Sequence, residues 1–188
     1  MKISKVALLG AAVALSAGIA GCNSDEGSSS VASSATSVAP TSTAASSPAS
    51  IDYPSLLIKP GDIDAGWTLK TTKPQQDGII GIFGNSEGTE KISSAVIVRE
   101  NSETAAAALA AAKDGASQKA GGAAFSPVDV GVGGGILNAP DGATVVAFSE
   151  GSAFAILEFE SKTGERVPAE VAIAIAKSQD AAIKAGVK

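Results

Sequence analysis

The chain of 188 residues carries a formal net charge of −5, and hydrophobic residues make up 45% of it. It has no histidine and one cysteine, Cys22, which excludes His- and Cys-based metal sites, His-dependent nucleophiles and disulfides within the chain. An acidic chain without clustered lysine or arginine also argues against nucleic-acid binding.

The N-terminus has the pattern of an export signal. Lys2 and Lys5 precede an apolar run over 6–20, which ends in small residues before Cys22. A basic start, a short apolar run and a small-residue cleavage site are typical of a secretory signal. The run is too short to span a bilayer comfortably, since spanning takes about 20 apolar residues. We expect cleavage between Gly21 and Cys22, and the loss of both lysines takes the net charge from −5 to −7.

The residues Ile19-Ala20-Gly21-Cys22 resemble the lipobox of bacterial lipoprotein signal peptides. This resemblance implies transfer of a diacylglycerol group to the Cys22 sulfur and removal of residues 1–21. With a third acyl chain, such as palmitate, the modified cysteine would have the two-signal anchoring that stable membrane attachment requires. The implied location is the outer face of the cell membrane, within the cell envelope. An ordinary signal peptide with a chance cysteine, or a transmembrane helix, is the alternative.

Residues 22–50 are predicted to form a disordered tether. After Cys22 the segment is mostly Ser, Thr, Ala and Pro, with charge only at Asp25 and Glu26. Such a composition cannot bury enough apolar surface to offset the entropy of ordering. A flexible segment of this length reaches about 30 Å on average, so it would hold a folded domain clear of the membrane. Glycosylation of the tether is left open.

The first half of the folded region is predicted to contain three strands and a helix. The strands are expected at 67–73, 79–84 and 92–99, and the helix at 102–118. The turn residues of 85–88 join the last two strands into a hairpin. Asn101 or Ser102 is a favourable N-cap, and Gly121-Gly122 ends the helix. The helix is nearly all alanine, and Leu109 is its only large apolar residue.

The second half is predicted to repeat this order. Strands are expected at 125–131, 135–138, 144–149 and 153–160, with the last two forming a hairpin at Glu150-Gly151. Pro168 opens a second helix that ends near Gly186. Val171, Ile175, Gln179 and Ile183 fall on one i, i+4 row of this helix. Residues 51–188 therefore predict a single extracytoplasmic α+β domain, with a mostly antiparallel sheet built from hairpins and two helices packed on one face.

Two patterns suggest chemistry, and each has a simpler interpretation. The glycines of 131–135 suggest a phosphate loop, but no Lys-Ser/Thr follows and no helix opens there, so a loop or a bulged strand edge is favoured. Glu158 and Glu160 share a strand face about 6.8 Å apart. An apolar setting would raise the pKa of Glu158, whereas a solvated strand end is favoured because buried unpaired acids are rare.

Two further features have a binding and a structural interpretation. Trp67, the only tryptophan, is a candidate binding aromatic, although a core position is favoured. Asp62, Asp64 and Asp77 suggest a hard cation, but their spacing is not that of an EF-hand, and turn or capping roles explain them better. We therefore predict no metal site and no cofactor.

Several segments resemble the small cell-envelope lipoproteins of mycobacteria and related actinobacteria. They are 56–63 with Gly66-Trp67, 151–159 and 179–184, and the resemblance extends over the whole chain with the lipobox and tether. None of these segments is a catalytic signature. Some similar lipoproteins carry lipid or bind partner proteins, and no ligand-binding residue can be transferred from them.

The sequence predicts a lipid-anchored, non-catalytic binding or adaptor module for an envelope lipid, glycan or protein. Trp67 and Glu158 are the candidate binding residues, and no residue is predicted to be catalytic. A passive structural surface lipoprotein or antigen is the alternative. A hydrolase that uses Glu158 and Glu160 is less favoured, because the usual general base, histidine, is missing. The ligand, the presence of an apolar cavity and the oligomeric state are left open.

Overall fold

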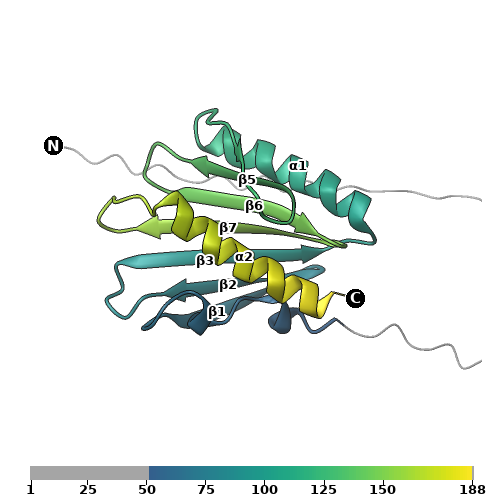
Figure 1. Ribbon diagram of the computed structural model, residues 1–188, viewed down its shortest axis with the longest axis horizontal. Coiled ribbons are helices and arrows are strands. Elements are labelled where there is room, and N and C mark those ends of the chain that lie inside the picture. The colour runs from purple at the N-terminus through teal and green to yellow at the C-terminus, as the bar shows by residue number, and fades with distance from the viewer. Residues whose placement is uncertain (1–50, 188) are drawn as a thin grey trace, which may run out of the picture. The chain divides into compact units, whose positions relative to one another are not determined.

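The computed structural model describes residues 51–187 (Figure 1). The predicted signal peptide, Gly21, Cys22 and the tether lie outside the described residues. Within the described part, no helix has the length and apolar character needed to cross a membrane. Among residues 51–187, no three histidine, cysteine, aspartate or glutamate side chains gather closely enough to hold a metal ion.

Seven strands form one antiparallel sheet in the order β1-β2-β3-β7-β6-β5-β4. The strands are β1 (Thr68–Gln75), β2 (Gly78–Gly84), β3 (Glu90–Val98), β4 (Ser126–Pro127), β5 (Val132–Asn138), β6 (Thr144–Glu150) and β7 (Ala153–Ser161). Two short 3-10 helices, η1 (Tyr53–Leu56) and η2 (Pro60–Asp62), precede the sheet, and the α-helices are α1 (Ser102–Lys119) and α2 (Ala169–Gly186). The predicted α+β class with a sheet of antiparallel hairpins is confirmed.

The two sequence blocks meet at the centre of the sheet. β3 is the last strand of the first half of the domain, and β7 is the last strand of the second half. The two strands pair antiparallel along their whole length, with Ala95 opposite Ile156. This long-range pairing places the start of β3 beside the end of β7, with Glu90 opposite Ser161. It thereby brings the β2–β3 turn near the chain that leads into α2.

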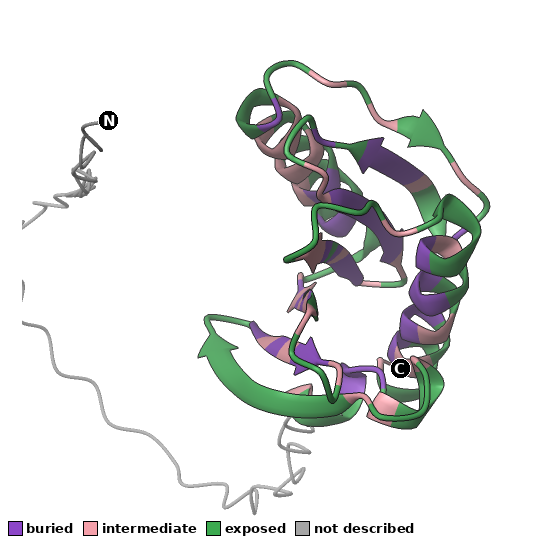
Figure 2. Cartoon of the chain, turned by 90° about the vertical axis from the view of Figure 1, so that its left-hand side faces the viewer, coloured by how far each residue is buried: buried purple, intermediate pink, exposed green. Residues whose placement is uncertain are grey.

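The helices lie on opposite faces of the sheet, so the prediction that both pack on one face is wrong. Ile175 and Ile183 of α2 belong to the cluster that contains Leu157, whereas Leu109 of α1 packs with Phe154. Leu157 and Phe154 have opposite parity on β7, so they point to opposite faces. In Figure 2 the sheet lies between the two helices.

The main hydrophobic core lies between α2 and the sheet. Its fully buried side chains include Phe83, Phe148, Phe159 and Ile183, together with Leu56 from η1. The predicted parity of β7 is confirmed, since Ala155, Leu157 and Phe159 are buried while Glu158 is exposed. On the predicted row of α2, Ile175, Gln179 and Ile183 are buried, whereas Val171 is 44% exposed.

The boundaries of three elements differ from prediction. The strand expected at 125–131 is reduced to Ser126–Pro127, because the chain turns over 128–131 and the backbone N–H of Val130 donates to the carbonyl of Val128. β5 then begins at Val132, with a break in register between Val132 and Gly135. Pro168 lies one residue before α2, at its N-cap position.

Candidate binding groove

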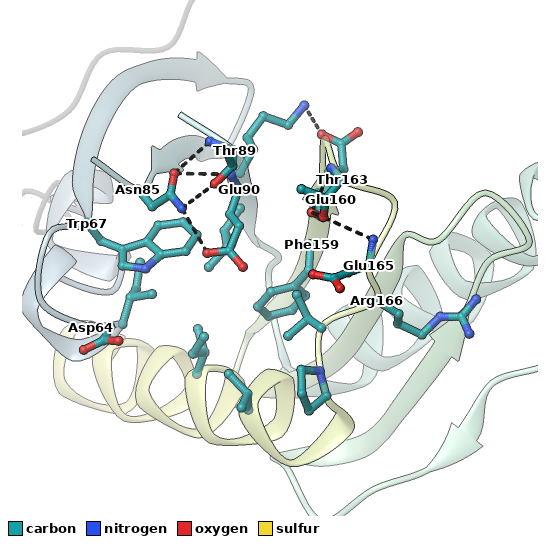
Figure 3. Close-up of a pocket in the computed structure, with 18 of the residues that line it drawn as sticks. Asp64, Trp67, Asn85, Thr89, Glu90, Phe159, Glu160, Thr163, Glu165 and Arg166 are labelled. Carbon is teal, nitrogen blue, oxygen red and sulfur yellow. Dashed lines mark hydrogen bonds and ion pairs between the residues drawn. The ribbon is translucent and has the colours of Figure 1, made fainter. Parts of the chain in front are cut away.

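A groove of about 900 Å³ opens beside the first two turns of α2 (Figure 3). Four separate parts of the chain form it: the segment between η2 and β1, the β2–β3 turn with the start of β3, the end of β7 with the loop that follows, and α2 itself. Its lining comprises Ile63, Asp64, Trp67, Asn85, Glu87, Thr89, Glu90, Lys91, Ile92, Phe159, Glu160, Ser161, Thr163, Glu165, Arg166, Val167, Pro168, Val171 and Ile175.

The floor of the groove is apolar. Ile92, Phe159 and Ile175 are buried there, and Val171 stands beside them with 44% of its surface exposed. Trp67 forms one wall: it is half-buried, packs against the main core and borders the groove. The structure thus supports the predicted core role of Trp67, and its indole also borders an open groove.

Asn85 organises the polar side of the groove. Its Oδ1 accepts hydrogen bonds from the backbone N–H groups of Thr89 (3.0 Å) and Glu90 (3.2 Å). Its Nδ2 donates to Thr89 Oγ1 at 2.9 Å and to Glu90 Oε2 at 3.1 Å. The amide therefore fixes the β2–β3 turn and holds the Glu90 carboxylate beside the indole of Trp67, as Figure 3 shows.

The charged side chains of the groove are unequal in number and in pairing. Five are acidic and two are basic, namely Asp64, Glu87, Glu90, Glu160 and Glu165 against Lys91 and Arg166. Lys91 forms an ion pair with Glu160. Arg166 donates to the carbonyl of Ala139 at 2.8 Å, and its guanidinium points away from the open space in Figure 3. The other four carboxylates form no ion pair within the described part of the chain.

The two residues predicted as candidate binding groups do not meet. Glu158 is exposed on the opposite face of the sheet, where it borders a pocket of about 430 Å³ between α1 and the sheet. Its register partners Ser93 and Val145 lie on the same face. The favoured interpretation of Glu158 as a residue of a solvated face is confirmed, and Trp67 and Glu158 border different pockets.

The other predicted alternatives agree with the structure where it describes them. Asp62 accepts from the backbone N–H of Lys59, and Asp64 from that of Ala65, so both have the predicted capping or turn role. Asp77 has a positive φ of 60° in the turn between β1 and β2. The glycines of 131–135 lie at the irregular start of β5, as the bulged-edge interpretation predicts.

Sequence reasoning missed most of the groove. Asn85 was recognised only as a turn residue, while Glu90, Glu165 and Arg166 had no pattern that linked them. The turn chemistry of 85–88 was a usable signal, because a turn that joins two buried strands places its polar side chains at one end of the sheet. Comparisons with protein-family models, curated proteins and solved structures find no match for this chain.

Proposed function

We propose that the protein is a lipid-anchored, non-catalytic binding module, and that its ligand binds in the groove beside α2. The observation that supports this function best is the groove of about 900 Å³, in which Trp67 and an apolar floor lie under a polar rim. Concave sites with an apolar lining and a few placed polar groups are the usual form of ligand sites. The N-terminal sequence supports attachment through Cys22, with the domain carried on a tether.

The placement of the carboxylates favours binding over hydrolysis. Glu158 and Glu160, the candidate acid–base pair, share one face of β7, but Glu158 borders the pocket between α1 and the sheet and Glu160 borders the groove beside α2. Glu160 is also held in an ion pair with Lys91. A pair of acids that acts on one bond must flank the same substrate, whereas these two residues line different pockets.

Photo-crosslinking in intact cells tests the proposed site. A photoreactive amino acid at position 171 would stand in the groove, and the same residue at position 132 provides a matched control. Val171 is 44% exposed and Val132 is 63% exposed, and Val132 lies on β5, away from the groove. We expect position 171 to give a discrete adduct, identified by mass spectrometry, that position 132 does not give.

The alternative function, a passive structural lipoprotein, predicts a different result. Without a specific ligand, both positions would give the same weak and diffuse products from chance encounters in the envelope. That result would count against the groove as a binding site. A discrete adduct at position 132 alone would place the binding surface elsewhere on the domain.

A further inference from the structure

We infer that the groove beside α2 recognises a basic segment of a partner protein, whose lysine or arginine side chain lies against Trp67 and between carboxylates of the rim. This inference rests on the proposed function, since it names the ligand class for the same site. It follows from the charge of the rim, from the position of the carboxylates and from the apolar floor beneath them.

The rim offers negative charge that the protein does not neutralise. Both basic groups of the lining are engaged, Lys91 with Glu160 and Arg166 with the carbonyl of Ala139. Among the described residues, Asp64, Glu87, Glu90 and Glu165 have no ion-pair partner. Complementary charge steers a partner to its site and selects against partners of the wrong sign, so this rim selects a cation.

Two of these carboxylates stand on opposite sides of the open space. Glu90 accepts a hydrogen bond from Asn85, which holds it next to Trp67. Glu165 belongs to the loop after β7, where its backbone N–H donates to Thr163 Oγ1 at 3.4 Å. In Figure 3 both side chains reach toward the space that separates Trp67 from Phe159. A cation in this space would have a carboxylate on either side and the indole of Trp67 beside it, and tryptophan is the best aromatic partner for a cation.

The apolar floor matches the rest of a lysine or arginine side chain. These residues bury an aliphatic stem along apolar surface while the charged head stays at a polar edge. Val171 and Ile175 provide such a surface directly below the acidic rim. A simple inorganic cation would use the rim but leave this floor without a role.

The same features disfavour a phosphate-bearing lipid and a neutral glycan. The rim would repel a phosphate, because its acids outnumber its bases and its bases are engaged. A glycan needs side-chain donors and acceptors for its hydroxyl groups. The amide of Asn85, the most suitable of these, already makes four hydrogen bonds within its own turn.

Intrinsic fluorescence tests this inference directly, because Trp67 is the only tryptophan of the chain. The mature lipoprotein in a non-ionic detergent would be titrated with pentalysine, and in parallel with pentaglutamate, maltopentaose and phosphatidylglycerol vesicles. We expect a saturable change of Trp67 emission with pentalysine alone. The apparent affinity should fall as the salt concentration rises, because exposed charges are screened by salt.

Paired variants separate the groove from the general negative charge of the chain. Glu90→Gln with Glu165→Gln should weaken pentalysine binding by about tenfold, the change expected when two exposed ion pairs are lost. Glu158→Gln with Glu103→Gln makes the same change of charge away from the groove and should leave the affinity within about twofold, since distant exposed charges are screened. Urea unfolding of all three proteins, the wild type and the two double variants, checks that each variant is folded.

Two results would overturn the inference. One is the absence of a pentalysine response, or an equal loss of affinity in both double variants, which would indicate attraction to net charge only. The other is saturable binding of maltopentaose or of the vesicles without binding of pentalysine. The second result would leave the proposed function standing, whereas the crosslinking experiment at position 171 tests that function whatever the ligand class.

Discussion

Gln179 joins three parts of the domain through one buried amide. It lies on α2 with no exposed surface, at a position of the helix row that is otherwise apolar. Its Oε1 accepts from the backbone N–H of Ile58 at 3.1 Å and from Ser94 Oγ at 2.8 Å, and its Nε2 donates to the carbonyl of Leu56 at 2.5 Å. The amide therefore satisfies the backbone of the segment that leads from η1 into the core.

Replacing Gln179 with Leu should destabilise the domain by about 2–4 kcal/mol, because each buried backbone group that loses its partner costs about 1–3 kcal/mol. Urea unfolding of the wild type and the variant would measure this difference. Gln118→Leu, the same change at an exposed glutamine of α1, is the control and should stay within about 0.5 kcal/mol. Equal effects at both positions would show that the Gln179 network contributes no specific stability.

Two lysines should make the stability of the domain change with pH in opposite directions under alkaline conditions. The pKa of Lys184 is raised above its ordinary value of 10.5, first by its hydrogen bond to Asp180 and then by the charges of Asp180 and Glu150. Burial lowers the pKa of Lys113, which donates to the carbonyl of Gly133 and lies over the ring of Phe125. A raised lysine pKa means that the folded state holds its proton longer than the unfolded state, and a lowered pKa means the reverse.

The contribution of Lys184 is therefore complete below pH 10.5 and is lost as pH rises through the higher folded-state pKa. Lys113 acts in the opposite direction, since its desolvation cost is relieved as pH rises from its lowered pKa toward 10.5. Thermal unfolding of Lys184→Met and Lys113→Met between pH 8 and 11 would test this. The stability difference from wild type should shrink with pH for the first variant and change in the opposite sense for the second. Parallel curves for the two variants would contradict the prediction.

At the scale of single elements, the start of β5 depends on a backbone conformation that only glycine adopts without strain. Gly131 has a positive φ of 51°, and a Cβ atom there would lie 2.5 Å from the carbonyl oxygen of Ser149 and 2.7 Å from Phe148 Cδ2. Both neighbours belong to β6, a strand with little freedom to move because it is buried on both faces. The glycine thus allows the chain to approach β6 and begin pairing.

Gly131→Ala should cost about 2–4 kcal/mol, from left-handed backbone strain and from overpacking against β6. Gly115→Ala in α1 offers a matched control, because a Cβ atom at that position meets nothing within 4 Å. Replacing a glycine inside a helix with alanine should raise stability by about 0.5–1 kcal/mol. Urea unfolding of both variants gives the sign of each change in the free energy of unfolding. A Gly131→Ala protein as stable as the wild type would show that the turn can rearrange.

The strands were predictable from sequence because side chains alternate along them. In β7, Leu157 and Phe159 alternate with Glu158 and Glu160, which fixes the buried face without knowledge of any partner strand. The faces to which the helices bind were not predictable. α1 is nearly all alanine with Leu109 as its only large apolar residue, so its sequence defines too narrow a stripe to indicate which side of the sheet it covers.

The two edges of the sheet are poor templates for a partner strand. β1 is exposed along its whole length and carries Lys70, Lys73 and Pro74, residue types that protect an edge from pairing with another chain. The opposite edge, β4, has only two residues and contains Pro127. Because strand addition is disfavoured at both edges, a groove is the favoured contact for a partner of this domain.

For the whole molecule, the groove could not be predicted because its residues come together only through the β3–β7 pairing. Trp67, Glu90 and Glu165 lie on three segments that are far apart in the sequence. No local period relates them, and only the antiparallel register brings the β2–β3 turn next to the loop after β7. Sequence reasoning therefore identified Trp67 as a candidate but not the carboxylates beside it, and its other candidate, Glu158, points to the other face of the sheet.

The anchor and the groove are predicted to be separable, because the core that the structure describes is built from residues 56–183. Cys22→Ser removes the sulfur that would accept diacylglycerol. We expect the variant to lose palmitate labelling and to leave the membrane fraction, since attachment would depend on the acyl chains. Its urea midpoint should match that of the wild type, and its Trp67 emission should still respond to pentalysine, because neither property requires the lipid.

Fractionation, palmitate labelling and mass spectrometry of the N-terminus would test the anchor. A Cys22→Ser protein that stays with the membranes and still carries the label would show that Cys22 is not the lipidated residue. A variant that is released but no longer binds pentalysine would show that the groove needs the membrane surface. If release and binding behave independently, the lipid determines where the domain is held and the acidic groove beside α2 determines what it holds there.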